Sequence, residues 1–518
     1  MSSESTIHHL VLLPVPAYGH TRPFCALAAR LAAARSSIVI TFLMAPNWLQ
    51  KVRADIAAQF PSGSEAINRI RIVTLFDSRA ADIFELIPLT AKHYPAAYET
   101  LLQGRAIRCA STGTEFPVVP APAAVFLDMF AFQQLHATRA QSGTAVPVFS
   151  IMASPAAAAI RTFGPEMLGG LGDLGARIDR EVARTGRPEE EVGSQIFRQT
   201  DGRVVEIPGL PPMYDYESFP QIILDAPIVQ YIRGGRELFM QADGVFLASA
   251  PAYDGETFAA LERWMNKDLK KPIYAVGPLL PFGYGSGQMQ VSSTDPREIE
   301  IATFLETMRS KYGDKSVLFI SFGTVFWPKL HEQVADLIEV LVEEKCPFII
   351  CHASPLASVP EGLAEEIKAS GLGLATSWAP QQFILNHPAT GWFMTHCGHG
   401  GIIESLCSGV PMICWPFEAD QPVAAAQLTL NLDVAFQLLE VRTGAGLRPL
   451  HRGYTPTGTR AAMRAEIRRV LTECRGTVGV AKRENVQKIQ GGLAQAWEEG
   501  GTARAALQAF FVKFLDAA

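Results

Sequence analysis

With 518 residues, the chain is too long for a single hydrophobic core, so we expect two domains. Its 48% hydrophobic and 19% charged residues exclude an intrinsically disordered protein. The formal net charge of −6, without a long basic run, argues against a nucleic-acid partner, because phosphate binding needs clustered Lys and Arg.

In residues 1–277, short apolar segments alternate with segments of helical pattern. A strand is expected at 9–15, followed by an Ala- and Leu-rich helix at 23–34 with Pro23 near its first turn. Further strands are expected at 38–43, 69–75, 125–127, 146–150 and 245–249. Strands that alternate with helices predict a doubly wound parallel sheet, so this region is expected to form a first Rossmann-like domain.

The pattern weakens between residues 164 and 220, which are rich in Gly, Pro and charge. Both a helical excursion with a loop over a ligand pocket and a variable surface insertion fit this composition. Clustered Gly, Pro and Ser after residue 277 indicate a linker, which we place at 278–297.

A second series of alternating elements occupies residues 298–501 and predicts a second Rossmann-like domain that faces the first. Strands are expected at 317–321, 347–351, 372–376, 391–395 and 412–415, and helices at 329–343 and 402–407. The expected fold class is therefore α/β with two parallel sheets. A last helical segment is expected at about 502–515.

The chain shows no segment typical of membrane insertion or secretion. No window reaches the roughly 18–20 continuous apolar residues of a membrane span. The N-terminal apolar run is broken by Pro14 and Pro16, and no basic region precedes it. The eight cysteines form no C-x-x-C pair. We therefore expect a soluble, cytoplasmic protein with reduced core cysteines and no transmembrane segment.

Residues 378–421 bring together groups that suit a nucleotide-like ligand. Trp378 offers a flat apolar ring, and such rings stack well on bases. A strand, a turn with Gly398, Gly400 and Gly401, and a helix follow, and this order presents backbone N–H groups and a positive helix end to an anion. Taken singly, each feature also has a plain structural explanation, such as a core tryptophan or an ordinary turn.

The whole segment resembles the signature of the family 1 UDP-sugar-dependent glycosyltransferases. The resemblance implies the GT-B arrangement, in which two Rossmann-like domains face each other and the last helix returns to the first domain. It also implies a UDP-sugar co-substrate, with no metal and no other cofactor. The implied donor-binding residues are Trp378 and Gln381 for the nucleoside, His396 for the diphosphate, Glu404 for the ribose, and Asp420 and Gln421 for the sugar hydroxyls.

The chain departs from the family pattern after Gly398. The usual plant form continues with Trp-Asn-Ser, whereas this chain has His399-Gly400-Gly401. The Asn and Ser contacts to phosphate are therefore missing, and backbone N–H groups of Gly400 and Gly401 are expected to replace them. A weaker match covers 321–324, where Ser321, Gly323 and Thr324 resemble a family turn near the donor phosphates.

Residues 16–23 resemble a family loop in which a Gly-His pair precedes a helix. His20 would stand at the carboxyl end of the first strand, where ligands bind in open α/β sheets. An imidazole titrates near neutral pH and can take a proton from an acceptor hydroxyl. Asp128 matches the family's partner carboxylate, which would orient this base. The plainer alternative is a loop histidine that caps the helix.

We therefore expect inverting transfer of a hexose from a UDP-sugar to a hydroxyl of a small lipophilic acceptor, such as a phenolic or sterol-like compound. The resemblance implies glucose as the sugar, because family members with Gln at the last place of this segment, here Gln421, are usually associated with glucose donors. Residues 131–132, 162–163 and 214–219 are candidates for the acceptor pocket. A monomer is expected.

Two alternatives stay open. The His399-Gly400-Gly401 departure would allow a non-catalytic nucleotide-sugar-binding protein. A NAD-dependent Rossmann oxidoreductase is the other, although no G-x-G-x-x-G follows the first strand.

Overall fold

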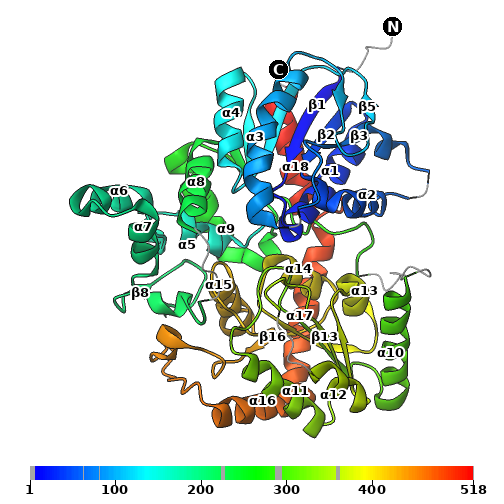
Figure 1. Ribbon diagram of the computed structural model, residues 1–518, viewed down its shortest axis with the longest axis vertical. Coiled ribbons are helices and arrows are strands. Elements are labelled where there is room, and N and C mark those ends of the chain that lie inside the picture. Colours follow the sequence, from blue (N-terminus) through cyan, green and yellow to red (C-terminus); the bar gives the residue numbers. More distant parts are fainter. Residues whose placement is uncertain are drawn as a thin grey trace.

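Each half of the chain forms a parallel β-sheet with helices on its faces, and the two sheets lie in separate lobes (Figure 1). The computed structural model describes residues 6–61, 63–80, 82–222, 228–285, 295–357 and 362–516. The predicted α/β class with two parallel sheets is confirmed.

The first sheet contains every strand expected in this half. Its strands are β1 (His8–Leu13), β2 (Ile38–Met44), β3 (Ile70–Thr74), β6 (Pro122–Asp128), β7 (Val148–Met152), β10 (Gly244–Leu247) and β11 (Ile273–Ala275). They pair in parallel in the order β11-β10-β7-β6-β1-β2-β3. The surrounding helices are α1 (Tyr18–Ala34), α2 (Leu49–Ala57), α3 (Ile83–Leu102), α4 (Phe132–Ser142), α5 (Ala156–Phe163), α8 (Ile228–Gln241) and α9 (Pro251–Trp264). The edge strand β11 was not predicted, because three residues carry too short a pattern.

Both faces of this sheet are buried, which explains the continuous apolar runs of its strands. In β1, Leu10 and Leu12 belong to one hydrophobic cluster, whereas Val11 and Leu13 belong to another. Successive side chains of a strand point to opposite faces, so a sheet covered on both sides needs apolar residues at every position.

The second sheet again contains all of the expected strands. They are β12 (Val317–Ser321), β13 (Phe348–Cys351), β14 (Gly373–Thr376), β15 (Thr390–Thr395) and β16 (Met412–Cys414), and the sheet adds an unpredicted edge strand, β17 (Ala435–Gln437). They pair in parallel in the order β14-β13-β12-β15-β16-β17. The helices of this half are α10 (Pro296–Tyr312), α11 (His331–Glu343), α12 (Leu363–Ala369), α13 (Gln381–Asn386), α14 (His399–Cys407), α15 (Gln421–Ala426), α16 (Arg460–Arg475) and α17 (Thr477–Gln495).

Two helices begin earlier than expected, and both corrections bear on the candidate site. Helix α1 begins at Tyr18 and not at 23, so Pro23 lies inside it. Helix α14 begins at His399 and not at 402, so Gly400 and Gly401 form its first turn and not the loop before it. Intrinsic propensity places glycine outside helices. Here the burial of Ile402, Ile403 and Leu406 against the sheet outweighs that preference.

The chain ends by returning to the first lobe. Helix α18 (Thr502–Phe514) places Leu507, Phe510 and Phe511 in the cluster that contains Leu10 of β1, and Figure 1 shows it in red beside the blue strands. Residues 286–294 of the expected linker lie outside the described residues, and α10 begins inside its remainder. The division into 1–277 and 298–501 stays a prediction.

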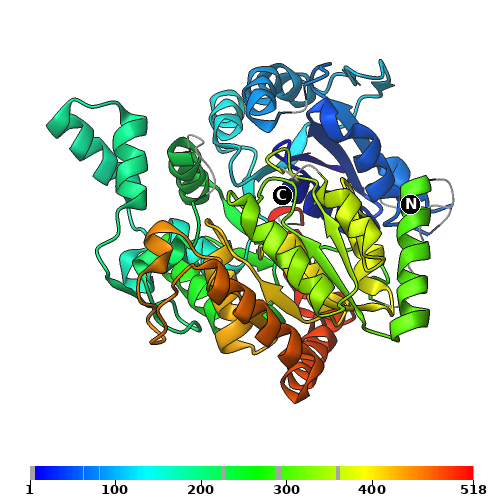
Figure 2. The ribbon, with the colours of Figure 1, turned by 60° about the horizontal axis from the view of Figure 1, so that its bottom comes forward.

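The segment 164–220 is a helical excursion that extends sideways from the first lobe in both ribbon views (Figures 1 and 2). It contains α6 (Leu174–Thr185), α7 (Glu189–Arg198) and a small hairpin of β8 (Val204–Val205) and β9 (Met213–Tyr214). A small cluster of its own, including Leu174 and Val192, joins the excursion to α8.

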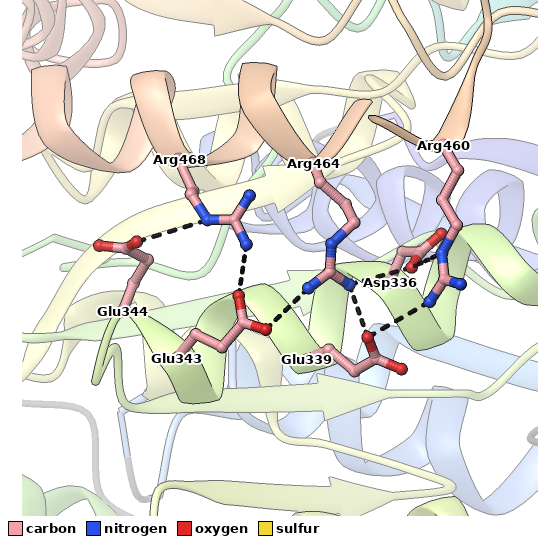
Figure 3. Close-up of polar contacts among 7 residues, drawn as sticks. All are labelled: Asp336, Glu339, Glu343, Glu344, Arg460, Arg464 and Arg468. Carbon is pink, nitrogen blue, oxygen red and sulfur yellow. Dashed lines mark hydrogen bonds and ion pairs between the residues drawn. The ribbon is translucent and has the colours of Figure 1, made fainter. Parts of the chain in front are cut away.

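An ionic ladder joins α11 to α16 (Figure 3). Arginines at 460, 464 and 468 share one face of α16, because residues four apart on a helix are neighbours. Arg464 is central: its Nη1 atom lies 3.0 Å from the buried Asp336, and its Nη2 atom lies 2.8 Å from Glu343. The full set is Asp336, Glu339, Glu343 and Glu344 with Arg460, Arg464 and Arg468.

Two further expectations can be compared with the structure. Within the described ranges, no helix combines the length and the apolar character that crossing a membrane requires. All eight cysteines are unpaired, and only Cys474 is not buried.

Candidate active site

A cavity of about 430 Å³ lies between the two lobes, and it collects the predicted site residues. His20 lines it from the first lobe. The predicted donor-binding residues line it from the second lobe: Ser321, Gly323, Thr324, Trp378, Gln381, His396, Gly398, Gly400, Gly401, Glu404, Asp420 and Gln421. His20 and residues that follow it by 301 positions or more thus meet at the carboxyl ends of two parallel sheets, where open α/β folds bind ligands.

His20 and Asp128 form a hydrogen-bonded pair at the first lobe's side of this cavity. His20 lies in the first turn of α1, and Asp128 is the fully buried last residue of β6. The His20 Nδ1 atom lies 2.8 Å from Asp128 Oδ2, while the Phe130 backbone N–H donates to Asp128 Oδ1 at 3.1 Å. A carboxylate only accepts hydrogen bonds, so Nδ1 carries the proton and Nε2 is left as the basic atom.

The surroundings of His20 favour its protonated form. Burial lowers the pKa of His20, but the charge and hydrogen bond of Asp128, together with the charge of Asp420, outweigh this effect and raise the pKa above its ordinary value. The side chain remains 25% exposed toward the cavity. This arrangement can accept a proton from a bound hydroxyl and stabilise the resulting imidazolium.

On the second lobe's side of the cavity, the Glu404 carboxylate binds several polar side chains. Its buried carboxylate accepts hydrogen bonds from Gln381 Nε2 at 2.6 Å and from Gln382 Nε2 at 3.0 Å. It also forms an ion pair with Arg22, whose Nη1 lies 2.5 Å from Glu404 Oε1. Gln382 and Arg22 were not predicted. The only sequence signal for Arg22 is its place just after His20, at the edge of the sheet where ligands bind.

Trp378 is covered by residues of the first lobe. The Lys51 ammonium lies 3.9 Å from the centre of its ring, and the Tyr18 ring meets it edge-on at 5.9 Å. The Tyr18 hydroxyl in turn donates to Asp55 at 2.9 Å. Sequence reasoning missed Lys51, since its helix contains no motif that points to a ligand.

The start of α14 offers backbone donors and almost no side-chain donors. Gly398 is its N-cap, and a Cβ atom there would lie 2.4 Å from His396 Nε2, so glycine lets this imidazole pack against the turn. A Cβ atom at Gly400 would meet nothing within 4 Å. Burial lowers the pKa of His396 to about 4, which keeps it neutral.

His399 links the two lobes. Its Nε2 atom donates to the backbone oxygen of Ala248, at the end of β10, at 2.8 Å. Burial lowers its pKa to about 4, so the ring is neutral. His399, which departs from the family pattern, therefore makes a contact between the two lobes.

Asp420, the N-cap of α15, and Gln421, its first residue, both line the cavity. Burial raises the pKa of Asp420 to about 6, although hydrogen bonds from the backbone and the charge of His20 oppose the rise. The Gln421 side-chain oxygen accepts from the Phe417 backbone N–H at 2.9 Å, which leaves its amide NH₂ group for another partner.

The aromatic residues predicted for the acceptor pocket do not line this cavity. Ala131 and Phe163 are core residues, so the prediction was wrong for them. Tyr216 lies under the Arg448 guanidinium, and Phe219 packs against Phe197. The segment 164–220 is helical in part, as the first alternative expected, but it contributes no residue to the cavity lining.

A different pair of rings lies beside the base. The Phe130 ring is 5.6 Å from the His20 ring, and the Tyr231 ring is 6.2 Å from that of Phe130. Phe130 follows Asp128 directly after β6, and this position was its only sequence signal. Among the described residues, no group of three His, Cys, Asp or Glu side chains is arranged to hold a metal ion.

Comparison with known proteins identifies the family. The family described as UDP-glucoronosyl and UDP-glucosyl transferase matches residues 251–443. The chain is 31% identical to UDP-glycosyltransferase eriJ of Hericium erinaceus, over 98% of both chains. It is 24% identical to anthocyanidin 3-O-glucosyltransferase 5 of Manihot esculenta, over 95% of this chain and 93% of that one.

Solved structures of UDP-glycosyltransferases have a similar fold. UGT71G1 of Medicago truncatula, solved in complex with UDP-glucose, superposes with a TM-score of 0.69 at 20% identity, over 99% of this chain and 100% of that one. This likeness establishes the GT-B fold. The chain therefore belongs to the family 1 UDP-glycosyltransferases, the enzymes that transfer a sugar from a UDP-sugar to a small-molecule acceptor.

Proposed function

We propose that this enzyme transfers glucose from UDP-glucose to a hydroxyl of a small lipophilic acceptor, with inversion at the anomeric carbon and without a metal. One observation carries the proposal: His20, hydrogen-bonded to the buried Asp128, lines the same cavity as the whole predicted donor set. A base and a donor cradle on opposite sides of one cavity suit a direct displacement.

In the proposed reaction, His20 Nε2 takes the proton of the acceptor hydroxyl. The acceptor oxygen forms a bond to the anomeric carbon from the face opposite the diphosphate. The bond between that carbon and the diphosphate oxygen breaks, and UDP leaves with the electron pair. Asp128 stabilises the imidazolium through the bond to Nδ1.

The donor roles are those that the family resemblance implies, and every residue concerned lines the cavity. Trp378 stacks on the uracil, Gln381 supports the nucleoside and Glu404 accepts from the ribose hydroxyls. His396, the first turn of α14 and the 321–324 turn face the diphosphate, where backbone N–H groups and the positive helix end stabilise an anion. Asp420 and Gln421 bind the sugar hydroxyls, and Gln421 favours glucose.

The acceptor is a phenolic or other lipophilic alcohol. The support is that the base stands against two aromatic rings, Phe130 and behind it Tyr231, which do not line the cavity themselves but make the surroundings of His20 apolar, and apolar surroundings favour an apolar substrate. A relative from Manihot esculenta is named for an anthocyanidin, which is a phenolic compound. We further propose a monomeric, cytoplasmic enzyme, which sedimentation and fluorescence imaging of a tagged chain would test.

A panel experiment tests the function. The purified chain is incubated with UDP-glucose, UDP-galactose or UDP-glucuronate and a set of phenolic and sterol acceptors, and UDP release and product mass are measured. We expect turnover with UDP-glucose and a product of inverted configuration. His20→Ala should lose transfer to hydroxyl acceptors while UDP-glucose still binds. Near-normal turnover in His20→Ala would reject the base, and tight UDP binding without release across the panel would favour the non-catalytic alternative.

A further inference from the structure

The charges that line the cavity are poorly balanced for a diphosphate. Among the described residues, the lining contains the carboxylates of Asp55, Glu298, Glu404 and Asp420, but its only permanent cations are Arg22 and Lys51. The histidines at 396 and 399 are neutral, because burial lowers the pKa of each to about 4. One of these two cations near a dianionic diphosphate would therefore add to the stabilisation that the helix end provides.

The first turn of α14 cannot supply that charge through its side chains. Its N-cap is Gly398, which makes no side-chain capping bond, and Gly400 and Gly401 carry no side chain. His399, the remaining residue of this turn, already donates to the Ala248 carbonyl of the other lobe. The turn contributes backbone N–H groups and a partial positive charge of about half a unit.

Arg22 lies where it can supply the missing charge. Its guanidinium contacts Glu404, which is four residues beyond Gly400 on α14, a rise of about 6 Å along the helix. The side chain is 27% exposed, and it lines the cavity. A guanidinium has five N–H donors in a fork that suits phosphate oxygens. Lys51, in contrast, lies over Trp378, at the nucleoside end.

We propose that Arg22 is a donor-binding residue whose guanidinium changes its ion-pair partner from Glu404 to the diphosphate when the donor binds. In the structure the guanidinium pairs with Glu404. When the ribose hydroxyls take the Glu404 carboxylate, Arg22 turns to the phosphate oxygens. There it neutralises the charge that develops as the bond from the anomeric carbon to the diphosphate oxygen breaks. This inference rests on the proposed donor site.

Calorimetric titration of UDP and of uridine separates this role from others. Uridine has the base and the ribose but no phosphate. Arg22→Met should weaken UDP binding at least about tenfold and leave uridine binding unchanged or tighter, since Glu404 loses a competing partner. Arg22→Lys keeps the charge without the fork and should lose less UDP affinity. Arg53→Met, on α2 and outside the cavity lining, is the charge-matched control, and it should change neither affinity.

A second variant tests the site by compensation. A side chain at Gly400 meets open space, so Gly400→Asn adds an amide donor at the start of α14 without a clash. In the Arg22→Met background it should recover part of the preference for UDP over uridine. Thermal melting confirms that each variant is folded, and Arg22→Lys carries the comparison if Arg22→Met is not.

The outcomes are distinguishable. If Arg22→Met or Arg22→Lys shifts UDP and uridine by the same factor, or shifts neither, the role at the diphosphate is overturned. If the unmodified chain itself fails to bind UDP or to transfer glucose, it is the proposed function that fails.

Discussion

Replacing Asp128 by Asn tests how the base is held. Asp128 uses both oxygens: Oδ2 accepts from His20 Nδ1 at 2.8 Å, and Oδ1 accepts from the Phe130 backbone N–H at 3.1 Å. An asparagine has a single acceptor oxygen. If that oxygen keeps the Phe130 bond, the NH₂ group faces His20 and donates to Nδ1. The proton of the imidazole then moves to Nε2, and the basic atom is lost.

The size of the effect follows from the bond that is removed. A hydrogen bond to a charged group contributes about 1.5–3 kcal/mol. The imidazolium needs this bond in the transition state, so the turnover number should fall by roughly 10- to 150-fold, at about 1.4 kcal/mol per factor of ten. UDP-glucose binding should be preserved, because Asp128 does not line the cavity.

The pH dependence gives an independent reading. Transfer needs neutral His20, so the acid limb of the rate profile follows the pKa of this residue. Asp128 raises that pKa against the lowering effect of burial. In Asp128→Asn burial remains and the raising charge is gone, so the acid limb should move to lower pH. UDP release measured from about pH 5 to 9 covers this range.

The same pair links pH to stability. Because the folded-state pKa of His20 is raised, the pair stabilises the fold fully below the unfolded-state pKa, and this stabilisation is lost as the pH rises through the folded-state pKa. Asp128→Asn should remove this dependence. A variant with an unchanged acid limb and a turnover number within about threefold of the original would refute the reasoning.

Two further predictions concern packing and the ionic ladder. Gly398→Ala should weaken UDP binding, because the added Cβ atom would lie 2.4 Å from His396 Nε2. The added Cβ atom of Gly400→Ala meets nothing within 4 Å, so this variant should bind UDP normally. Similar losses of UDP affinity in both variants, measured by calorimetry, would contradict this reasoning. Arg464→Met should lower the free energy of unfolding by about 1–3 kcal/mol, because it removes a partner of the buried Asp336, and it should leave transfer unchanged. Urea unfolding measures the loss, and an unchanged midpoint would show that Arg460 alone satisfies Asp336.

Local patterns in the sequence determined the strands, and the family resemblance supplied most of the candidate site. The long buried strands of both sheets were predicted because a strand covered on both faces must be apolar throughout. His20, Asp128 and the 378–421 residues were predicted because their motifs resemble those of a known family, and the strand ends and helix starts beside them agree with a ligand site. The same reasoning missed β11 and β17, which are three residues long and lie at sheet edges.

Only the tertiary structure decided what lies across the cavity. The contacts of Arg22 with Glu404, of Lys51 with Trp378 and of His399 with Ala248 join residues of different lobes. No local pattern encodes such pairs, since their energy depends on how two separately folded sheets meet. The acceptor side was wrongly predicted for the same reason: an aromatic residue such as Phe163 has the same sequence signature in a core as in a pocket, and only packing distinguishes the two.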